Sequence, residues 1–211
     1  MALQEEVYKA IAELRVIAAA GLQFASSPYE TMRYERIQAL CARLIAAAEQ
    51  APFEDALALL QGELFTDHVS PVSTADAVVQ RGDTILLIRR HDNGLWALPG
   101  GLVEINHTLA ETAILELQEE TGLVARVDKL LGIFDSQRWD SQEKVHLHHA
   151  IFLMADVEGE PITTSEALDT GWFAENNLPP LSPGHHLRVP FVFQLLRGEH
   201  MIPYLDMPPL L

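Results

Sequence analysis

Apolar residues recur at three- and four-residue intervals through the first part of the chain. This spacing is typical of one face of an amphipathic helix. It holds at Leu3, Val7, Ile11 and Leu14. Gly21 follows, and we expect it to end the helix because glycine is common just after the last helical residue.

A second helix is expected to begin at Ser27. Serine is a preferred residue for capping the free N–H groups at a helix start, and Pro28 suits the first helical position. Glu30 stands three residues after the serine, which predicts a capping box between the two side chains. The apolar stripe then continues through Ile37, Leu40, Leu44 and Ala48, and a shorter pattern follows Pro52.

The pattern changes from helical to mixed at about residue 72. Strand-like segments at 75–80 and 84–88 flank Arg81-Gly82-Asp83, which predicts a hairpin turn. Further strands are expected at 125–135, 146–156 and 170–174, and helices at 108–121 and 188–197. These elements interleave without an even βαβ rhythm, which favours an α+β fold. We therefore expect a helical domain over residues 1–68 and a mixed domain over residues 69–211.

Composition narrows the possible partners. The chain has 14 basic and 30 acidic residues and a net charge of −16, so long nucleic acids are not expected to bind. Cys41 is the only cysteine, so no disulfide can form within the chain, and its place in an apolar stripe predicts a buried thiol. No apolar run is long enough to span a membrane, and Glu5 and Glu6 stand where a secretory signal needs basic residues. We expect a cytoplasmic protein with no membrane partner.

The most informative segment begins at a glycine pair and ends in a row of carboxylates. Gly100 and Gly101 suit a tight turn whose backbone carbonyl can reach a metal ion. Glu116, Glu119 and Glu120 stand at positions i, i+3 and i+4, on one face of one helix. Like charges at this spacing repel one another, and a hard divalent cation such as Mg²⁺ or Mn²⁺ would remove the conflict. Considered alone, such glutamates are more often a solvated helix face.

The whole segment resembles the signature of the Nudix family, G-x5-E-x7-R-E-U-x-E-E-x-G-U, in which U is aliphatic. The alignment begins at Gly101 and runs without gaps to Leu123. The matching positions near its end are Glu116, Leu117, Glu119, Glu120, Gly122 and Leu123. Two positions depart from the pattern: His107 replaces its first glutamate, and Leu115 replaces its arginine. The resemblance implies that the metal ligands are kept, whereas part of the shell that supports them is lost.

The resemblance extends to both flanks of this segment. Residues 20–34 are similar to the helical amino-terminal extension of one Nudix subgroup, and residues 166–182 are similar to its carboxyl-terminal part. That subgroup hydrolyses the pyrophosphate bond of a nucleoside diphosphate linked to another moiety, such as ADP-ribose or CDP-choline. The implied fold is a mixed β-sheet sandwiched between helices, preceded by a small all-helical domain. The implied assembly is a homodimer formed through the amino-terminal helices.

The resemblance also implies which groups hold the metal and activate water. Gly100, Glu116, Glu119 and Glu120 would hold Mg²⁺ or Mn²⁺. Two places remain open for the base that takes a proton from the attacking water. One is Glu119 or Glu120 on the helix, and the other is Glu166 in a later loop.

Contacts with the substrate are expected from Arg89, Gly101 and His107. The alternatives are an arginine that faces solvent and a surface histidine without a role. A separate group of histidines, His146, His148 and His149, lies on an expected strand. Alternating histidines on a strand are weak evidence for a metal site, so these histidines alone do not predict a zinc site.

Two functions other than catalysis remain open. The losses at His107 and Leu115 are compatible with a Nudix domain that binds a nucleotide as a sensor and hardly hydrolyses it. Three clustered carboxylates argue for an enzyme, because a binding module does not need them. The amino-terminal helices could also serve as a scaffold, which does not exclude catalysis.

Overall fold

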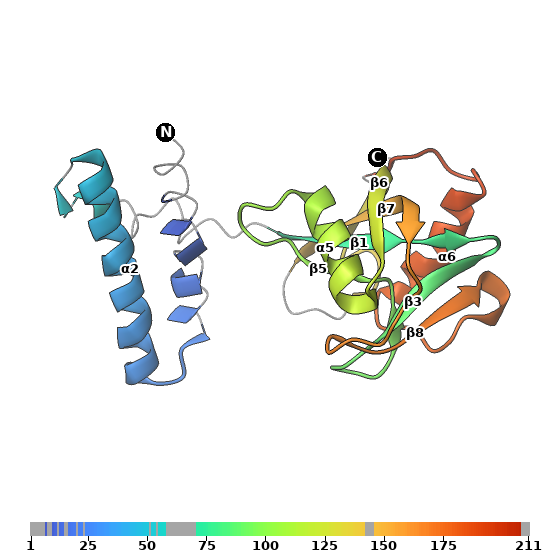
Figure 1. Cartoon of the computed structure of the whole chain (residues 1–211), viewed down its shortest axis with the longest axis horizontal. Coiled ribbons are helices and arrows are strands. Elements are labelled where there is room, and N and C mark those ends of the chain that lie inside the picture. The colour runs from blue at the N-terminus through green and yellow to red at the C-terminus, as the bar shows by residue number, and fades with distance from the viewer. Residues whose placement is uncertain are drawn as a thin grey trace. The chain divides into compact units, whose positions relative to one another are not determined.

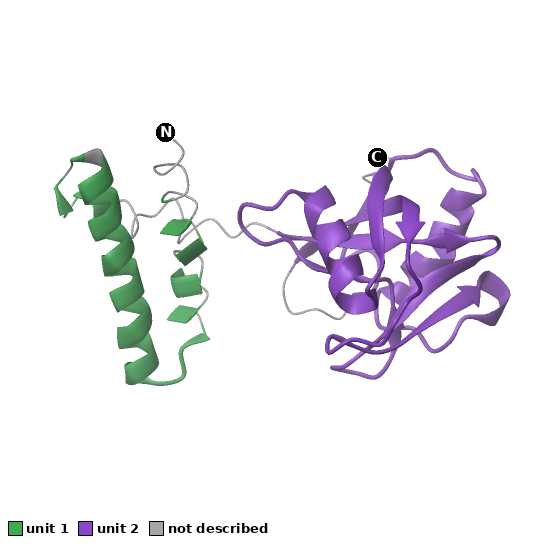
Figure 2. Cartoon of the chain, viewed as in Figure 1, with its two compact units in different colours: residues 1–70 green, residues 71–211 purple. Residues whose placement is uncertain are grey.

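The computed structural model describes residues 71–141, 146–207 and 24–50, together with separate positions between 7 and 22 and between 52 and 57. The chain divides into two compact units, residues 1–70 and residues 71–211 (Figure 2). Each unit is described by itself. No helix in these ranges is long and apolar enough to cross a membrane.

The main element of the first unit is the helix α2, Pro28–Glu49 (Figure 1). It begins as expected, because the Ser27 hydroxyl accepts a hydrogen bond from the N–H of Glu30 at 3.3 Å. The predicted capping box is only half formed. The Glu30 carboxylate accepts its shortest bond from the N–H of Ser26, at 2.8 Å, one residue before the cap. The thiol of Cys41 is buried, as predicted, beside Ile11 and Ala42.

The expectation that Gly21 ends the first helix is wrong. The chain is helical at Gly21, Leu22 and Phe24. A Cβ atom at Gly21 would lie 2.2 Å from the ring of Tyr34, which belongs to α2. The glycine therefore lets two helices approach closely, and the helix continues past it because glycine lowers helix stability by only about 1 kcal/mol.

The described part of the second unit contains two β-sheets. One has the strand order β5-β1-β7-β6-β9, and in the other β2, β4 and β8 all pair with β3. Parallel and antiparallel pairs both occur, since β1 runs parallel to β7 whereas β6 runs antiparallel to it. The strands are β1 Val72–Val78, β2 Gln80–Arg81, β3 Thr84–Arg90, β4 Trp96–Ala97, β5 Gly100–Leu102, β6 Val124–Asp135, β7 Leu147–Glu158, β8 Ala167–Ala174 and β9 Tyr204–Leu205.

The predicted hairpin turn at Arg81-Gly82-Asp83 is present between β2 and β3. Its first strand is shorter than expected. The segment 75–80 is divided between β1, which pairs with β5 and β7, and β2, which pairs with β3. The chain thus passes from one sheet to the other near Val79, and a run of apolar residues gives no sign of that change of partner.

Helices cover the sheets on two sides, α5 Leu109–Thr121 on one and α6 His185–Leu196 on the other, with a 3₁₀ turn at Glu175–Asn177 before α6 (Figure 1). Among its described residues the unit has two hydrophobic cores, one on each side of the sheets. Successive residues of a strand point to opposite faces, so they contribute to different cores. Ala75, Ala77 and Val79 pack with Leu117 of α5. Val78, with the neighbouring strand residues Ile85 and Leu87, packs with Val192 of α6. The expected mixed sheet between helices, preceded by a helical segment, is confirmed.

Candidate active site

The helix α5 presents the carboxylates of the Nudix-like segment. It begins with a complete capping box between Thr108 and Glu111, and it ends at Gly122, whose φ of 74° is a left-handed conformation that favours glycine. Ala113 and Leu117 are buried against the sheet. The helix is therefore held by both ends and by one face, which fixes the direction of the glutamates that it carries.

The loop before β8 brings Glu166 close to the glutamates of α5. Carboxylate oxygens of Glu116, Glu119 and Glu166 all lie within 4.8 Å of one another. The loop before β8 is attached to the end of α5: the N–H of Ile162 donates to the carbonyl of Thr121 at 2.9 Å, and the Thr164 hydroxyl donates to the carbonyl of Glu120 at 3.3 Å. We call Glu116, Glu119, Glu120 and Glu166 the carboxylate cluster.

The two glycines of β5 allow the strand to touch this cluster. The N–H of Gly100 donates to Oε2 of Glu120 at 2.8 Å. A Cβ atom at Gly101 would lie 2.3 Å from Oε1 of Glu116, and a Cβ atom at Gly100 would lie 2.5 Å from Oδ1 of Asp76. A larger residue at either position would push a carboxylate away from the place it occupies.

Negative charge in the cluster is costly. Burial, followed by the charges of Glu119 and Glu166, raises the pKa of Glu116 to about 7. Burial also raises the pKa of Glu120 to about 8, although the Gly100 N–H opposes this shift. Carboxylates that cannot all ionise together at neutral pH are relieved by a divalent cation, which prefers oxygen ligands.

A cavity of about 450 Å³ opens beside the cluster. Gly100, Gly101, Glu120 and Glu166 line part of it. Another part is lined by side chains from β1, β7 and α6 that are almost inaccessible to solvent. These are Asp76, His149, His185 and Arg188, and we call them the buried wall.

Two polar atoms of the buried wall, one on His149 and one on Asp76, have no hydrogen-bond partner among the described residues. Nδ1 of His149 lies 2.7 Å from the Thr74 hydroxyl, whereas its Nε2 has no hydrogen-bond partner among the described residues. Burial, followed by the nearby charge of Arg188, lowers the pKa of His149 to about 3, so its ring is neutral at pH 7. Oδ2 of Asp76 also has no hydrogen-bond partner in this part of the chain, and burial raises the pKa of Asp76 to about 6. Unsatisfied buried groups at a cavity indicate a place for a ligand.

Two residues expected to contact the substrate are not among the described residues that line the cavity. The side chain of Arg89 is exposed and donates to the carbonyl of Gly94 at 2.9 Å, and Arg90, the next residue, lines the cavity. His107 is exposed in the turn before α5 and does not line the cavity. Gly101 does line it, as expected for a residue near the substrate.

The buried wall was missed by sequence reasoning. Asp76 carried a usable signal, because it is an acidic residue within the apolar run 75–79. His149 stands beside His148, and only the register of β7 separates a cavity residue from a surface residue. His185 and Arg188 lie one turn apart on α6, far along the chain from the glutamates, and no local pattern links them to the site.

Each of the two units matches a known protein family. The family described as "NUDIX domain" matches residues 70–195, and the family described as "UDP-X-like, N-terminal oligomerisation domain" matches residues 5–60. The Bacillus subtilis protein named "Putative ADP-ribose pyrophosphatase YjhB" is 33% identical over 189 residues, which are 87% of this chain and 89% of that protein. An ADP-ribose pyrophosphatase of Methanocaldococcus jannaschii is 35% identical over 121 residues, 56% of this chain and 70% of the other.

A solved structure matches the chain over nearly its whole length. The crystal structure of a UDP-X diphosphatase is 25% identical, with a TM-score of 0.59, over 96% of this chain and 99% of that one. The resemblance inferred from Gly101 to Leu123 is thus confirmed, as is the helical extension. The chain belongs to the Nudix hydrolase family and carries the amino-terminal extension of its UDP-X-like members.

Proposed function

We propose that this protein hydrolyses the pyrophosphate bond of a nucleoside diphosphate linked to a second moiety, with Mg²⁺ or Mn²⁺ as cofactor. The products would be a nucleoside monophosphate and a phosphorylated second moiety. One observation carries the proposal: the carboxylates of Glu116, Glu119 and Glu166 converge beside a cavity that has a separate, buried polar wall. ADP-ribose, CDP-choline and UDP-linked compounds are the substrate candidates, in view of the relatives and the Nudix resemblance.

The residues present fit a divalent cation. All the side-chain ligands are carboxylates, and burial together with mutual repulsion raises the pKa of Glu116 and of Glu120. Glu116, Glu119 and Glu120, with the backbone of Gly100, would hold the ion. When bound, the metal neutralises the diphosphate and lowers the pKa of water at the site.

The carboxylates differ in how well they suit the roles of metal ligand and general base. Glu120 is fixed by the N–H of Gly100 and is largely buried, which suits a ligand more than a group that must exchange protons with solvent. Glu119 and Glu166 are exposed. Either can take the proton from the attacking water, so among the three candidates for the general base Glu119 and Glu166 fit better than Glu120.

The buried wall would receive the part of the substrate that does not react. Nε2 of His149 and Oδ2 of Asp76 can hydrogen-bond a hydroxyl or an amine of the substrate. Arg90, which lines the same cavity, carries a positive charge that suits a phosphate. We therefore propose Arg90, in place of Arg89, as the arginine that contacts the substrate.

We also propose that the first unit pairs two chains into a homodimer. The family matched by residues 5–60 is described as an oligomerisation domain. Several large apolar side chains of this unit are exposed, among them Phe24 at 74%, Tyr29 at 59% and Met32 at 56%. Light scattering of the Phe24→Glu and Met32→Glu variants tests this proposal, since both should shift the protein toward the monomer and the exposed-site variant Glu35→Gln should not.

The test of the activity is a panel of ADP-ribose, CDP-choline, UDP-sugars, dinucleoside polyphosphates and nucleoside triphosphates, each incubated with the protein and Mg²⁺ or Mn²⁺. A nucleoside monophosphate should appear from a linked diphosphate, and only when the metal is present. A compound that raises the melting temperature without being cleaved would instead favour the sensor, for which the replaced residues His107 and Leu115 provide a reason.

A further inference from the structure

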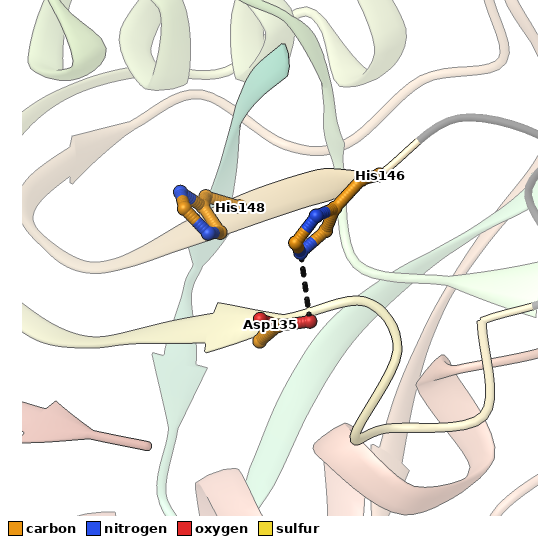
Figure 3. Close-up of side chains that lie close together, drawn as sticks. All are labelled: Asp135, His146 and His148. Carbon is orange, nitrogen blue, oxygen red and sulfur yellow. Dashed lines mark ion pairs between the residues drawn. The ribbon is translucent and has the colours of Figure 1, made fainter. Parts of the chain in front are cut away.

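A second group of side chains that could hold a metal ion lies on the sheet, outside the carboxylate cluster. Asp135 is the last residue of β6, His146 directly precedes β7, and His148 is the second residue of β7 (Figure 3). The strands pair with Asp135 opposite His148. Figure 3 shows the two imidazole rings on the same side of β7 as the carboxylate, which comes from the neighbouring strand.

The potential ligand atoms are close together. One nitrogen from each histidine and one oxygen of Asp135 all lie within 4.8 Å of one another. Nε2 of His146 is 3.0 Å from Oδ1 of Asp135. That nitrogen is screened from solvent, and within the described residues it makes no hydrogen bond of good geometry, although it lies at ion-pair distance from the carboxylate. The rings of His146 and His148 meet edge to face, with centroids 5.2 Å apart.

The backbone around the cluster is well fixed. The N–H of Gln137 donates to Oδ1 of Asp135 at 2.9 Å, and the N–H of Asp135 donates to Asp206 at 2.8 Å. Ser136 and Leu147 join the two strands through the pair Ser136 N–H to Leu147 carbonyl and Leu147 N–H to Ser136 hydroxyl, both at 2.9 Å. Hydrogen bonds of this kind hold metal ligands in position.

The carboxylate is ready to act as an anionic ligand. Burial raises the pKa of Asp135, but the N–H of Gln137 and the neighbouring histidines lower it by more, so the net shift is downward. Asp135 is thus ionised at neutral pH.

We propose that Asp135, His146 and His148 bind a transition-metal ion of the Zn²⁺ type, at a site separate from the carboxylate cluster. Two imidazole nitrogens and one carboxylate oxygen are the ligands of many zinc and iron sites and leave positions for water, whereas Mg²⁺ prefers oxygen ligands alone. The ion joins the two ends of the β6–β7 connection. Ser141, in that connection, lines the catalytic cavity, so metal at this site stabilises one border of the cavity.

The test is a titration of the full chain with Co²⁺ in excess Mg²⁺, followed by visible absorption and by competition with Zn²⁺. Magnesium occupies oxygen-only sites, and Co²⁺ bound by imidazole gives a visible band that Zn²⁺ removes by displacement. We expect the wild-type chain to bind one such ion. The His148→Ala, His146→Ala and Asp135→Ala variants should each lose at least about tenfold in affinity.

His186→Ala is the matched control, because Nε2 of His186 lies 3.4 Å from Asp140 in a pair that contains only one histidine. It should bind Co²⁺ like the wild-type chain. Equal affinity in the wild-type chain and in His148→Ala would overturn the proposal and leave only the ion pair between His146 and Asp135.

NMR spectroscopy of the wild-type chain tests the same metal site without any variant, so it still applies if a variant unfolds. Addition of Zn²⁺ in excess Mg²⁺ should shift the imidazole NMR signals of His146 and His148 and leave those of His91 and His200 in place. Uniform or absent shifts contradict the site. The outcome does not depend on hydrolysis, so a protein that cleaves no nucleotide can still bind Zn²⁺ here.

Discussion

The carboxylate cluster and the buried wall border one cavity, but different forces hold them in place. Glu119 and Glu166 are exposed, and the cluster is assembled from like charges that repel one another. The buried wall places His149 and Arg188 at 6% and 1% exposure, with the imidazole kept neutral by its surroundings. A metal ion would stabilise the cluster, whereas packing already stabilises the wall. The cluster is suited to chemistry that depends on a cation, and the wall is suited to recognition.

Removing one of the proposed metal ligands from the carboxylate cluster should have the largest effect on activity. In Glu116→Gln the side chain keeps its size but loses the charge, so the metal is held less well and kcat/KM should fall by about a thousandfold, which is about 4 kcal/mol. Steady-state kinetics with the best substrate of the panel measure this loss. Glu158→Gln, at the exposed end of β7, is the control and should keep full activity. Full activity of Glu116→Gln would remove the cluster from the mechanism.

The next largest effect is expected from a change of pH, which should alter metal binding by the carboxylate cluster. Below a pKa of about 7 for Glu116 and about 8 for Glu120, protons compete with the metal. Metal affinity should therefore rise by about five-hundredfold from pH 6 to pH 8, about tenfold from Glu116 and about fiftyfold from Glu120. Calorimetric titration with Mn²⁺ measures the affinity and the protons released. An affinity that does not change with pH would show that these carboxylates are not ligands.

The same pKa shifts make the folding stability of the metal-free protein depend on pH. Both pKa values are higher in the folded chain than in the unfolded one, so protonation of Glu116 and Glu120 favours folding. That contribution is fully present below pH 4.5 and is lost as the pH rises through 7 to 8. Melting temperatures measured with a chelator should accordingly decrease from pH 6 to pH 8.5, and Mg²⁺ should reverse the decrease. A constant melting temperature in the chelator contradicts this linkage.

The difference between the carboxylate cluster and the buried wall also explains which parts of the site could be predicted from the sequence. Glu116, Glu119 and Glu120 lie within two turns of one helix, so helical periodicity alone places them together. The strands and α5 were recognisable because their apolar spacing is local. Asp76, His149 and Arg188 come from three elements, and their meeting depends on the pairing of β1 with β7 and on the docking of α6. Asp135 meets His146 in the same way, through a strand pairing that periodicity does not specify.

Replacing His149 should alter recognition and leave the chemical step almost unchanged. In His149→Leu the cavity loses the Nε2 atom, and a substrate group that bonds to it is left unsatisfied, which raises KM by about tenfold with kcat nearly constant. Kinetics over a range of substrate concentrations separate the two parameters. His200→Leu, at an exposed histidine bonded to Gln194, is the control. An equal fall in kcat would place His149 in the chemical step.

The smallest expected effect comes from restoring the two replaced positions of the Nudix segment. Leu115 is half-buried and stands four residues before Glu119, so an arginine there can donate hydrogen bonds to the cluster, which leucine cannot do. His107 is exposed before α5, and a glutamate there adds a carboxylate that the arginine can hold. The double variant His107→Glu with Leu115→Arg should gain up to about tenfold in kcat/KM through firmer ligands. His107→Glu alone adds charge without its partner, so it should gain less than the pair. No gain in the double variant would mean that other contacts, such as the Gly100 N–H on Glu120, already orient the cluster sufficiently.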